Sequence, residues 1–145
     1  MPHFAIHTNV NKDYKAVYEG FDRQLFDELK PVFPRLRVLE FDGQRVDGRV
    51  TVELDFLLAK FIWGVKIVSI SESLEEIEFV DEGVDLPWFL KYWKHRHIIK
   101  HTGISTTIVD DITYYTPNKF LDWIFYPIFK LQFTMRSPIY ERYFA

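Results

Sequence analysis

The chain has 145 residues, 48% apolar and 27% charged, with a formal net charge of −3. It is long enough for one globular domain, and its slight negative charge disfavours a nucleic-acid partner. The lack of cysteine excludes disulfides, thiol nucleophiles and Cys-ligated metal sites. The unusual feature is an aromatic content of 18%, which requires a large aromatic core, a cavity or an adhesive surface.

The N-terminal part of the chain predicts one strand followed by two short helices. Apolar side chains alternate over residues 3–10, which is typical of a strand. Residues 14–29 have helical spacing that is interrupted at residues 20–22, because glycine breaks a helix and aspartate caps the next one. Pro31 and Pro34 then end the helical region.

The middle of the chain, from residue 36 to residue 115, predicts only strands with short connections. The expected strands cover residues 37–42, 49–56, 60–71, 75–81, 88–101 and 104–115. Pro117 then predicts the first turn of a long helix that runs to about Arg136, before Ser137-Pro138. This order predicts an α+β domain, residues 1–145, in which a curved antiparallel sheet packs on the C-terminal helix and can enclose a cavity.

Two consecutive strands carry a recognisable residue pattern. Trp93 to His97 reads W-x-H-x-H, and Thr107 to Pro117 reads T-x-x-D-x-I-x-Y-x-x-P and enters the last helix. With the element order, this resembles the START-like SRPBCC superfamily, especially ligand-binding members related to polyketide cyclase/dehydrase and coenzyme Q-binding proteins. The resemblance implies the helix-grip fold and a hydrophobic ligand. It does not fix the chemistry, since such scaffolds host binding, transport and catalysis.

A turn between these two strands sets their expected register. If Thr102-Gly103 forms a two-residue loop, His95 lies opposite Asp110 and His97 lies opposite Ile108. A His–carboxylate pair could act as a polar anchor or as a general acid/base in an apolar cavity. The alternative is a structural pair that fixes the strand register.

Two pairs of histidines share a strand face and could offer metal ligands. His95 and His97 lie on one strand face, but no third ligand is evident, so no metal site is expected. His3 and His7 show the same weak pattern in the first strand. No cofactor is expected either, since the sequence has no G-x-G-x-x-G, P-loop or G-x-S-x-G motif.

Residues of inward parity define the predicted ligand-binding set, for which an ordinary core is the alternative interpretation. From the strands it contains Trp63, Phe79, Phe89, Trp93, His95, His97, Asp110, Ile112 and Tyr114. From the last helix it contains Leu121, Ile124, Phe125 and Ile128, with Met135 on the same face.

These observations favour binding or transport of a small hydrophobic ligand, such as a lipid, an isoprenoid or an aromatic polyketide-like molecule. One alternative is a cyclase- or aromatase-type enzyme in which His95 and Asp110 move protons. Another is a protein-interaction module that uses an aromatic surface. The last helix is apolar nearly all round, which predicts contact with the N-terminal helices or, second, a homodimer. We expect no signal peptide and no membrane span, and a cytoplasmic location.

Overall fold

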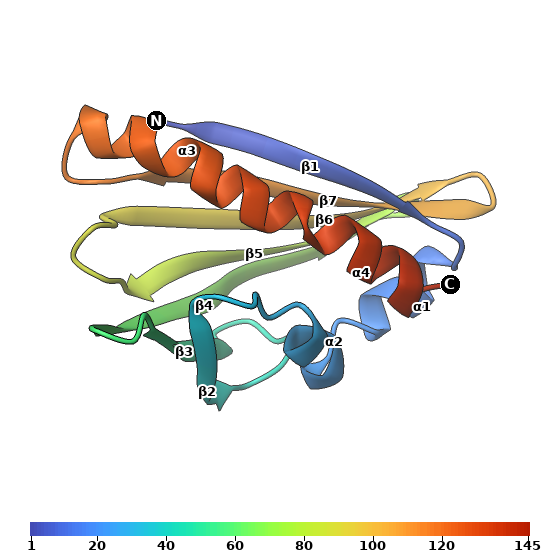
Figure 1. Ribbon diagram of the computed structural model, residues 1–145. Coiled ribbons are helices and arrows are strands. Elements are labelled where there is room, and N and C mark those ends of the chain that lie inside the picture. The colour runs from blue at the N-terminus through green and yellow to red at the C-terminus, as the bar shows by residue number, and fades with distance from the viewer.

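The sheet of this protein is antiparallel and has seven strands in the order β1-β7-β6-β5-β4-β3-β2. The computed structural model describes residues 1–145. The strands are β1 (His3–Val10), β2 (Arg35–Phe41), β3 (Arg49–Asp55), β4 (Lys60–Glu72), β5 (Glu76–Asp85), β6 (Tyr92–Thr102) and β7 (Ser105–Tyr115). The chain therefore runs as a meander from β2 to β7, and β1 closes the edge beside β7 (Figure 1).

Four helices accompany the sheet: α1 (Tyr14–Glu19), α2 (Arg23–Glu28), α3 (Lys119–Thr134) and α4 (Arg136–Tyr143). The predicted break between the short helices is confirmed. Asp13 caps α1 by accepting the backbone N–H groups of Lys15 and Ala16, and Asp22 caps α2 by accepting that of Leu25. No helix is both long and apolar enough to cross a bilayer.

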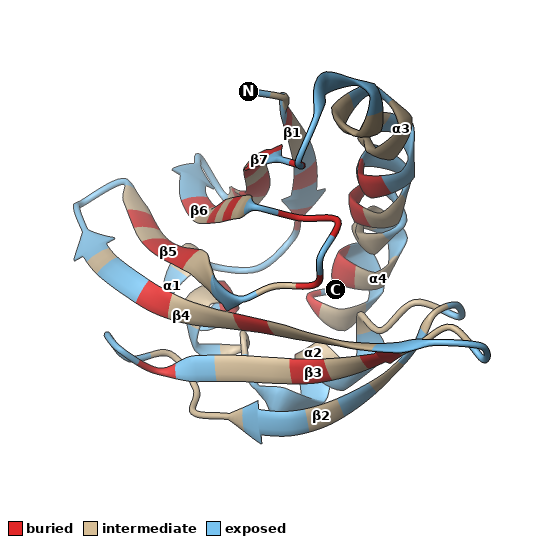
Figure 2. Cartoon of the chain, turned by 90° about the vertical axis from the view of Figure 1, so that its left-hand side faces the viewer, coloured by how far each residue is buried: buried red, intermediate tan, exposed pale blue.

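The helices α3 and α4 lie across the concave side of the curled sheet (Figures 1 and 2). The α+β architecture predicted from the sequence, a curved antiparallel sheet that grips a C-terminal helix, is therefore confirmed. The buried side chains form two hydrophobic clusters. One joins α1, α2 and α4 to the sheet and includes Phe79 and Tyr140, while the other lies beneath α3 and includes Trp93 and Phe129.

The C-terminal helical region differs from the prediction at both ends. Pro117 lies outside α3, because Asn118 is the cap and its side chain accepts the Leu121 N–H at 2.9 Å. The helix does not stop before Ser137-Pro138. After a break at Met135 it continues as α4, where Pro138 occupies the first turn and its missing N–H removes no intrahelical hydrogen bond.

The β6–β7 hairpin has a different register from the predicted one. Thr102 pairs with Ser105, so the loop is Gly103-Ile104, and the strands are shifted by two residues. Gly103 has a φ of +71° and stands first in the loop, the position where a type II′ turn requires glycine. His97 therefore lies opposite Asp110, and His95 opposite Ile112. Because the shift is even, every side chain keeps its predicted face of the sheet.

The inward face of α3 also differs from the predicted one. Phe129 and Phe133 are the buried residues of this helix, whereas Ile128 and Met135 are exposed. The spacing of Phe129 and Phe133 continues through Arg136 and Tyr140, so a single stripe runs along both helices. The face that α3 presents to the sheet is therefore the one that continues into α4.

Candidate ligand cavity and buried polar cluster

A cavity of about 420 Å³ lies between the sheet and the helices α2, α3 and α4, and 20 of its 31 lining residues are hydrophobic. Eight residues of the predicted ligand-binding set line it: Trp63, Phe79, Phe89, Trp93, His95, His97, Phe125 and Ile128. The Trp63 and Trp93 rings meet edge to face, with centroids 4.9 Å apart. The wall is therefore aromatic over much of its length, which suits a flat or acyl apolar ligand.

Five residues of the predicted set lie elsewhere. Ile112 and Tyr114 are fully buried in the core beneath α3, and the Tyr114 hydroxyl donates to the Asp122 carbonyl at 2.8 Å. Asp110 is buried behind His95 and does not line the cavity. Leu121 and Ile124 are half-buried in α3, outside the cavity wall, because the face of this helix is rotated from the predicted one.

Several cavity residues were missed by sequence reasoning. Asp81, Gln132 and Arg136 supply polar groups, and apolar ones are Leu25, Phe26, Leu29, Leu36, Val50, Val52, Leu54, Phe56, Val65, Ile67, Phe129 and Phe133. Asp81 could have been found, because it shares the inward parity of Phe79 in the same strand. The contribution of α2 and β2 could not, because it depends on how far the sheet curls.

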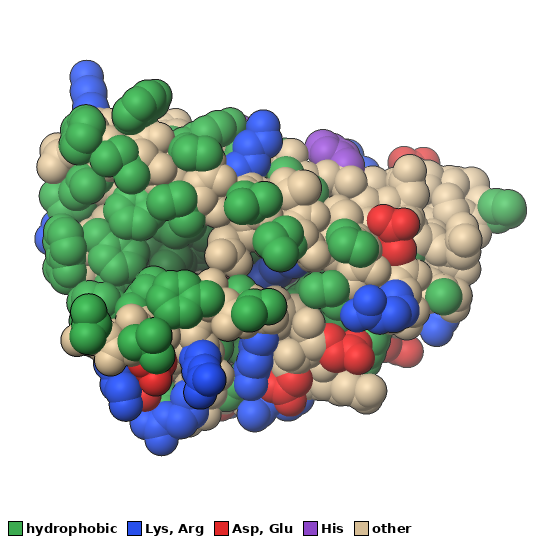
Figure 3. Space-filling view, in the orientation of Figure 1, with side chains coloured by type: hydrophobic (Ala, Val, Ile, Leu, Met, Phe, Trp, Pro, Cys, Tyr) green, Lys and Arg blue, Asp and Glu red, His purple; other side chains and the backbone are tan.

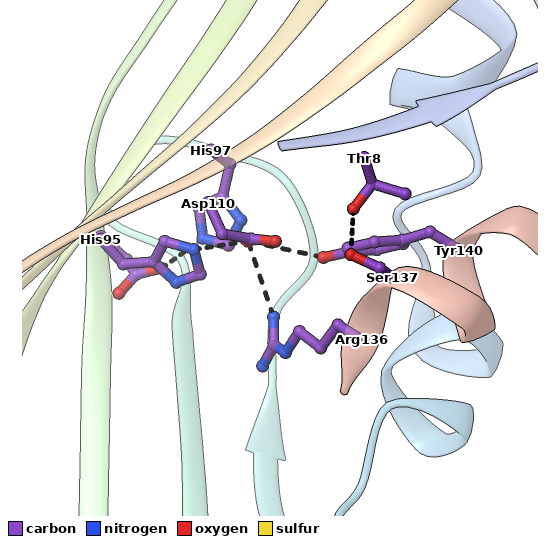
Figure 4. Close-up of polar contacts among 8 residues, drawn as sticks. Thr8, His95, His97, Asp110, Arg136, Ser137 and Tyr140 are labelled. Carbon is purple, nitrogen blue, oxygen red and sulfur yellow. Dashed lines mark hydrogen bonds and ion pairs between the residues drawn. The ribbon is translucent and has the colours of Figure 1, made fainter. Parts of the chain in front are cut away.

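A buried polar cluster joins β6, β7 and α4 (Figure 4), and its His95, His97 and Arg136 side chains line the cavity. His95 Nε2 lies 2.8 Å from Asp110 Oδ1, and both side chains are almost fully buried. From α4, the Tyr140 hydroxyl donates to the same oxygen at 3.5 Å, and Arg136 Nη1 lies 3.8 Å from it. The predicted His95–Asp110 hydrogen bond is therefore present, but as a diagonal contact across the hairpin.

The second half of the cluster joins β5 to β6. His97 Nε2 lies 2.7 Å from Asp81 Oδ2, and the His97 ring is stacked between His95 at 3.6 Å and Phe79 at 4.1 Å, measured between centroids. Burial, followed by the charge of His95, lowers the pKa of His97 to about 4, although Asp81 opposes the shift. His97 is therefore neutral at pH 7.

The ionisation of Asp110 is set by its neighbours. Burial alone would raise its pKa, but the hydrogen bond and charge of His95 and the charge of Arg136 outweigh burial and lower it. The pKa of Tyr140 is raised by burial and by Asp110. Asp110 is thus a carboxylate, Tyr140 is a phenol, and Arg136 lines the cavity with 22% of its side-chain surface accessible.

Asp81, His95 and His97 also present ligand atoms within 4.8 Å of one another, and these residue types can bind a metal ion. The planes of the two stacked rings are only 28° apart. Because imidazole lone pairs lie in the ring plane, nearly parallel stacked rings do not direct both lone pairs at one ion. The arrangement fits a hydrogen-bonded network better than a metal site.

Comparisons with known proteins place this geometry in a fold group. No family model matches the sequence, and neither does any curated protein. Among solved structures, the di-domain ARO/CYC StfQ of the steffimycin biosynthetic pathway superposes with a TM-score of 0.71 at 10% identity, over 98% of this chain and 50% of that chain. The chain has the helix-grip fold.

Two plant proteins show the same likeness over their whole length. A Thalictrum norcoclaurine synthase has a TM-score of 0.65 at 12% identity, with 99% of this chain and 96% of that chain covered. Ginseng major latex-like protein 151 from Panax ginseng has a TM-score of 0.64 at 17% identity, with 99% and 97% covered. The helix-grip fold that the sequence resemblance implies is therefore confirmed.

Proposed function

We propose that this helix-grip protein binds a small hydrophobic molecule, such as a lipid, an isoprenoid or an aromatic polyketide-like compound, between its sheet and α3. The observation that carries the proposal is the aromatic-walled cavity of about 420 Å³. Burial of about 300 Å² of apolar ligand surface there would contribute about 7 kcal/mol before association costs. Micromolar binding is therefore within reach without any covalent chemistry.

The polar cluster gives the ligand a preferred orientation. His97 and Arg136 line the cavity among apolar neighbours, and Arg136 carries several N–H donors on its planar guanidinium. A ligand with one oxygen acceptor would place that oxygen near Arg136 and its apolar body along Trp63 and Trp93. His95 and Asp110 support this arrangement by holding Arg136 close to the sheet through the Asp110 carboxylate.

A cyclase-type reaction is the second candidate. It is favoured by the His95 ring, which lines the cavity and is hydrogen-bonded to the Asp110 carboxylate behind it. A carboxylate in that position orients an imidazole that moves a proton to or from a bound substrate. An ARO/CYC protein shares the fold, so the scaffold is compatible with this chemistry.

The test is native mass spectrometry of the protein purified from its own host, followed by solvent extraction and identification of any released molecule. We expect one apolar molecule per chain. A Val65→Trp variant fills the cavity and should lose it, whereas Val68→Trp changes an exposed neighbour on the same strand and should retain it. If wild-type protein carries no such molecule and takes up no apolar fluorescent probe, the proposal is wrong. An enzyme would convert the extracted molecule on incubation, whereas a carrier returns it unchanged.

A further inference from the structure

Five large apolar side chains are exposed in three neighbouring segments of the chain. They are Leu57 and Leu58, which are 75% and 101% exposed, Trp88 at 64%, Phe120 at 66% and Trp123 at 73%. We call these five residues the apolar rim. Exposed tryptophans and leucines gathered at one place mark a contact surface, whereas single ones scattered over a protein do not.

The antiparallel topology places the three segments at one end of the sheet. Alternate connections of an antiparallel meander lie at the same end of the sheet. This end carries the β3–β4 connection, the β5–β6 connection and the segment from β7 to α3. In Figure 3, apolar side chains gather at that end, around a hollow in the surface. The opposite end carries the β4–β5 and β6–β7 turns.

The rim adjoins the ligand cavity without being part of it. None of its five residues lines the cavity. Phe56 and Phe89, which adjoin Leu57 and Trp88 in the chain, do line it, and so does Phe125, two residues after Trp123. An apolar molecule that enters or leaves the cavity at this end would therefore cross the rim.

The backbone of the β3–β4 connection supports a functional role for the exposed leucines. Leu57 adopts a φ of +75°, which is rare for a residue with a Cβ, and its N–H donates to Asp55 at 2.8 Å. In this turn both leucines project into solvent, and backbone in this sparsely populated region is found preferentially at contact and ligand-binding sites.

Each rim segment also carries an exposed lysine. Lys60 follows Leu58, Lys91 follows Trp88, and Lys119 precedes Phe120. The lysines that form ion pairs in this protein are Lys30 and Lys66, so these three charges are free. Of the aspartates at this end, Asp55 and Asp122 accept backbone N–H groups, and Asp85 is exposed.

We propose that the apolar rim docks onto the surface of a lipid bilayer, with its tryptophans at the interface and its lysines at the phosphates. Amphipathic indole rings beside lysines are the side chains that favour this depth. A second copy of the chain fits less well, because a twofold contact through the rim would bring like lysine clusters together. A role of the bilayer as the source or acceptor of the cavity ligand rests on the proposed function. Docking of the rim onto the bilayer does not.

The test measures co-sedimentation of the full chain with vesicles of phosphatidylcholine and phosphatidylglycerol, and with phosphatidylcholine alone. We expect wild-type protein to bind both, and more strongly with the anionic lipid. The double variant Trp88→Ser/Trp123→Ser should lose about ten-fold or more in partitioning. The matched control is Leu74→Ser/Ile104→Ser, which removes two fully exposed apolar side chains at the opposite end of the sheet and should bind like wild type.

The proposal is overturned if wild-type protein does not bind the vesicles, or if both double variants lose vesicle binding equally. It is also overturned if sedimentation velocity shows a dimer that the tryptophan substitutions dissociate, while the protein does not bind vesicles. Uptake of an apolar fluorescent probe without vesicles separates this proposal from the proposed function. The rim variant should still take up the probe, whereas Val65→Trp should lose uptake and still bind vesicles.

Discussion

His95 and Asp110 are joined by a 2.8 Å contact between Nε2 and Oδ1, although the strand register places them two residues apart. Diagonal neighbours on one face of an antiparallel pair lie within reach of a side chain as long as histidine. Asp110 is also the carboxylate nearest Arg136, so a single buried group holds β6, β7 and α4 together.

The first prediction concerns removal of that carboxylate. Asp110→Ala leaves the buried His95 ring and the partly buried Arg136 charge without their partner, and should lower the free energy of unfolding by about 3–5 kcal/mol. The adjacent Asp111 pairs with His3 and Arg96, which are both substantially exposed. Asp111→Ala should therefore cost only about 0–1 kcal/mol. Urea denaturation measures both, and equal effects would contradict the role given to Asp110.

The second prediction is that the protein loses stability on acidification, starting at a pH above that at which carboxyl groups are protonated. The pKa of His97 falls from its ordinary value of 6.5 to about 4 in the folded protein, so the unfolded chain binds more protons between these values. Stability should therefore fall as pH drops from 6.5 towards 4, by at most about 3 kcal/mol from this group. The pKa of Asp110 is lowered from 3.8 in the folded protein, so its protonation causes a further loss of stability as the pH falls below 3.8.

Urea denaturation at a series of pH values checks this dependence. A His97→Gln variant keeps a hydrogen-bonding side chain but cannot titrate, so its stability should vary less than that of wild type between pH 6.5 and 4. NMR of the imidazole nitrogens should also show His97 neutral at pH 5. A His97 that is already protonated at pH 6 would contradict the environment described for it.

The fold could be predicted because its signals are local. Strand alternation, the Gly20–Asp22 break and the motifs around Trp93 and Asp110 each lie within a few residues of one another, and short connections limit the topology. The even register shift also shows why the prediction of His95 and Asp110 on one face survived an error in the loop.

The cavity could be predicted only in part, because its wall depends on distances that no local pattern sets. The face of α3 is chosen by Phe129 and Phe133 together with Tyr140 in α4, and the helix was expected to end before that residue. Asp81 reaches the cluster through the pairing of β5 with β6, which places it opposite His95. Such pairings join residues far apart in the sequence, so no local sequence pattern predicts them.

The third prediction concerns the start of α3. Asn118 accepts the Leu121 N–H, one of the backbone donors that has no partner inside the helix. Asn118→Ala should lower the free energy of unfolding by about 1 kcal/mol, and Asn118→Asp should restore most of it. Thermal unfolding of the three proteins tests the cap. If Asn118→Asp is as unstable as Asn118→Ala, the side chain acts in some way other than capping.

The last prediction tests which face of α3 packs on the sheet. The Phe129 ring contacts Trp63, Trp93 and Tyr114 edge to face, with centroids 6.0, 5.5 and 4.9 Å away. Phe129→Ala should therefore lower the free energy of unfolding by about 3–5 kcal/mol. Trp123, six residues earlier in the same helix, is 73% exposed, and Trp123→Ala should change stability by less than about 0.5 kcal/mol. The two substitutions together show which face of α3 packs on the sheet. If the helix were rotated so that Ile124 and Ile128 faced the sheet, Phe129→Ala would be the harmless substitution.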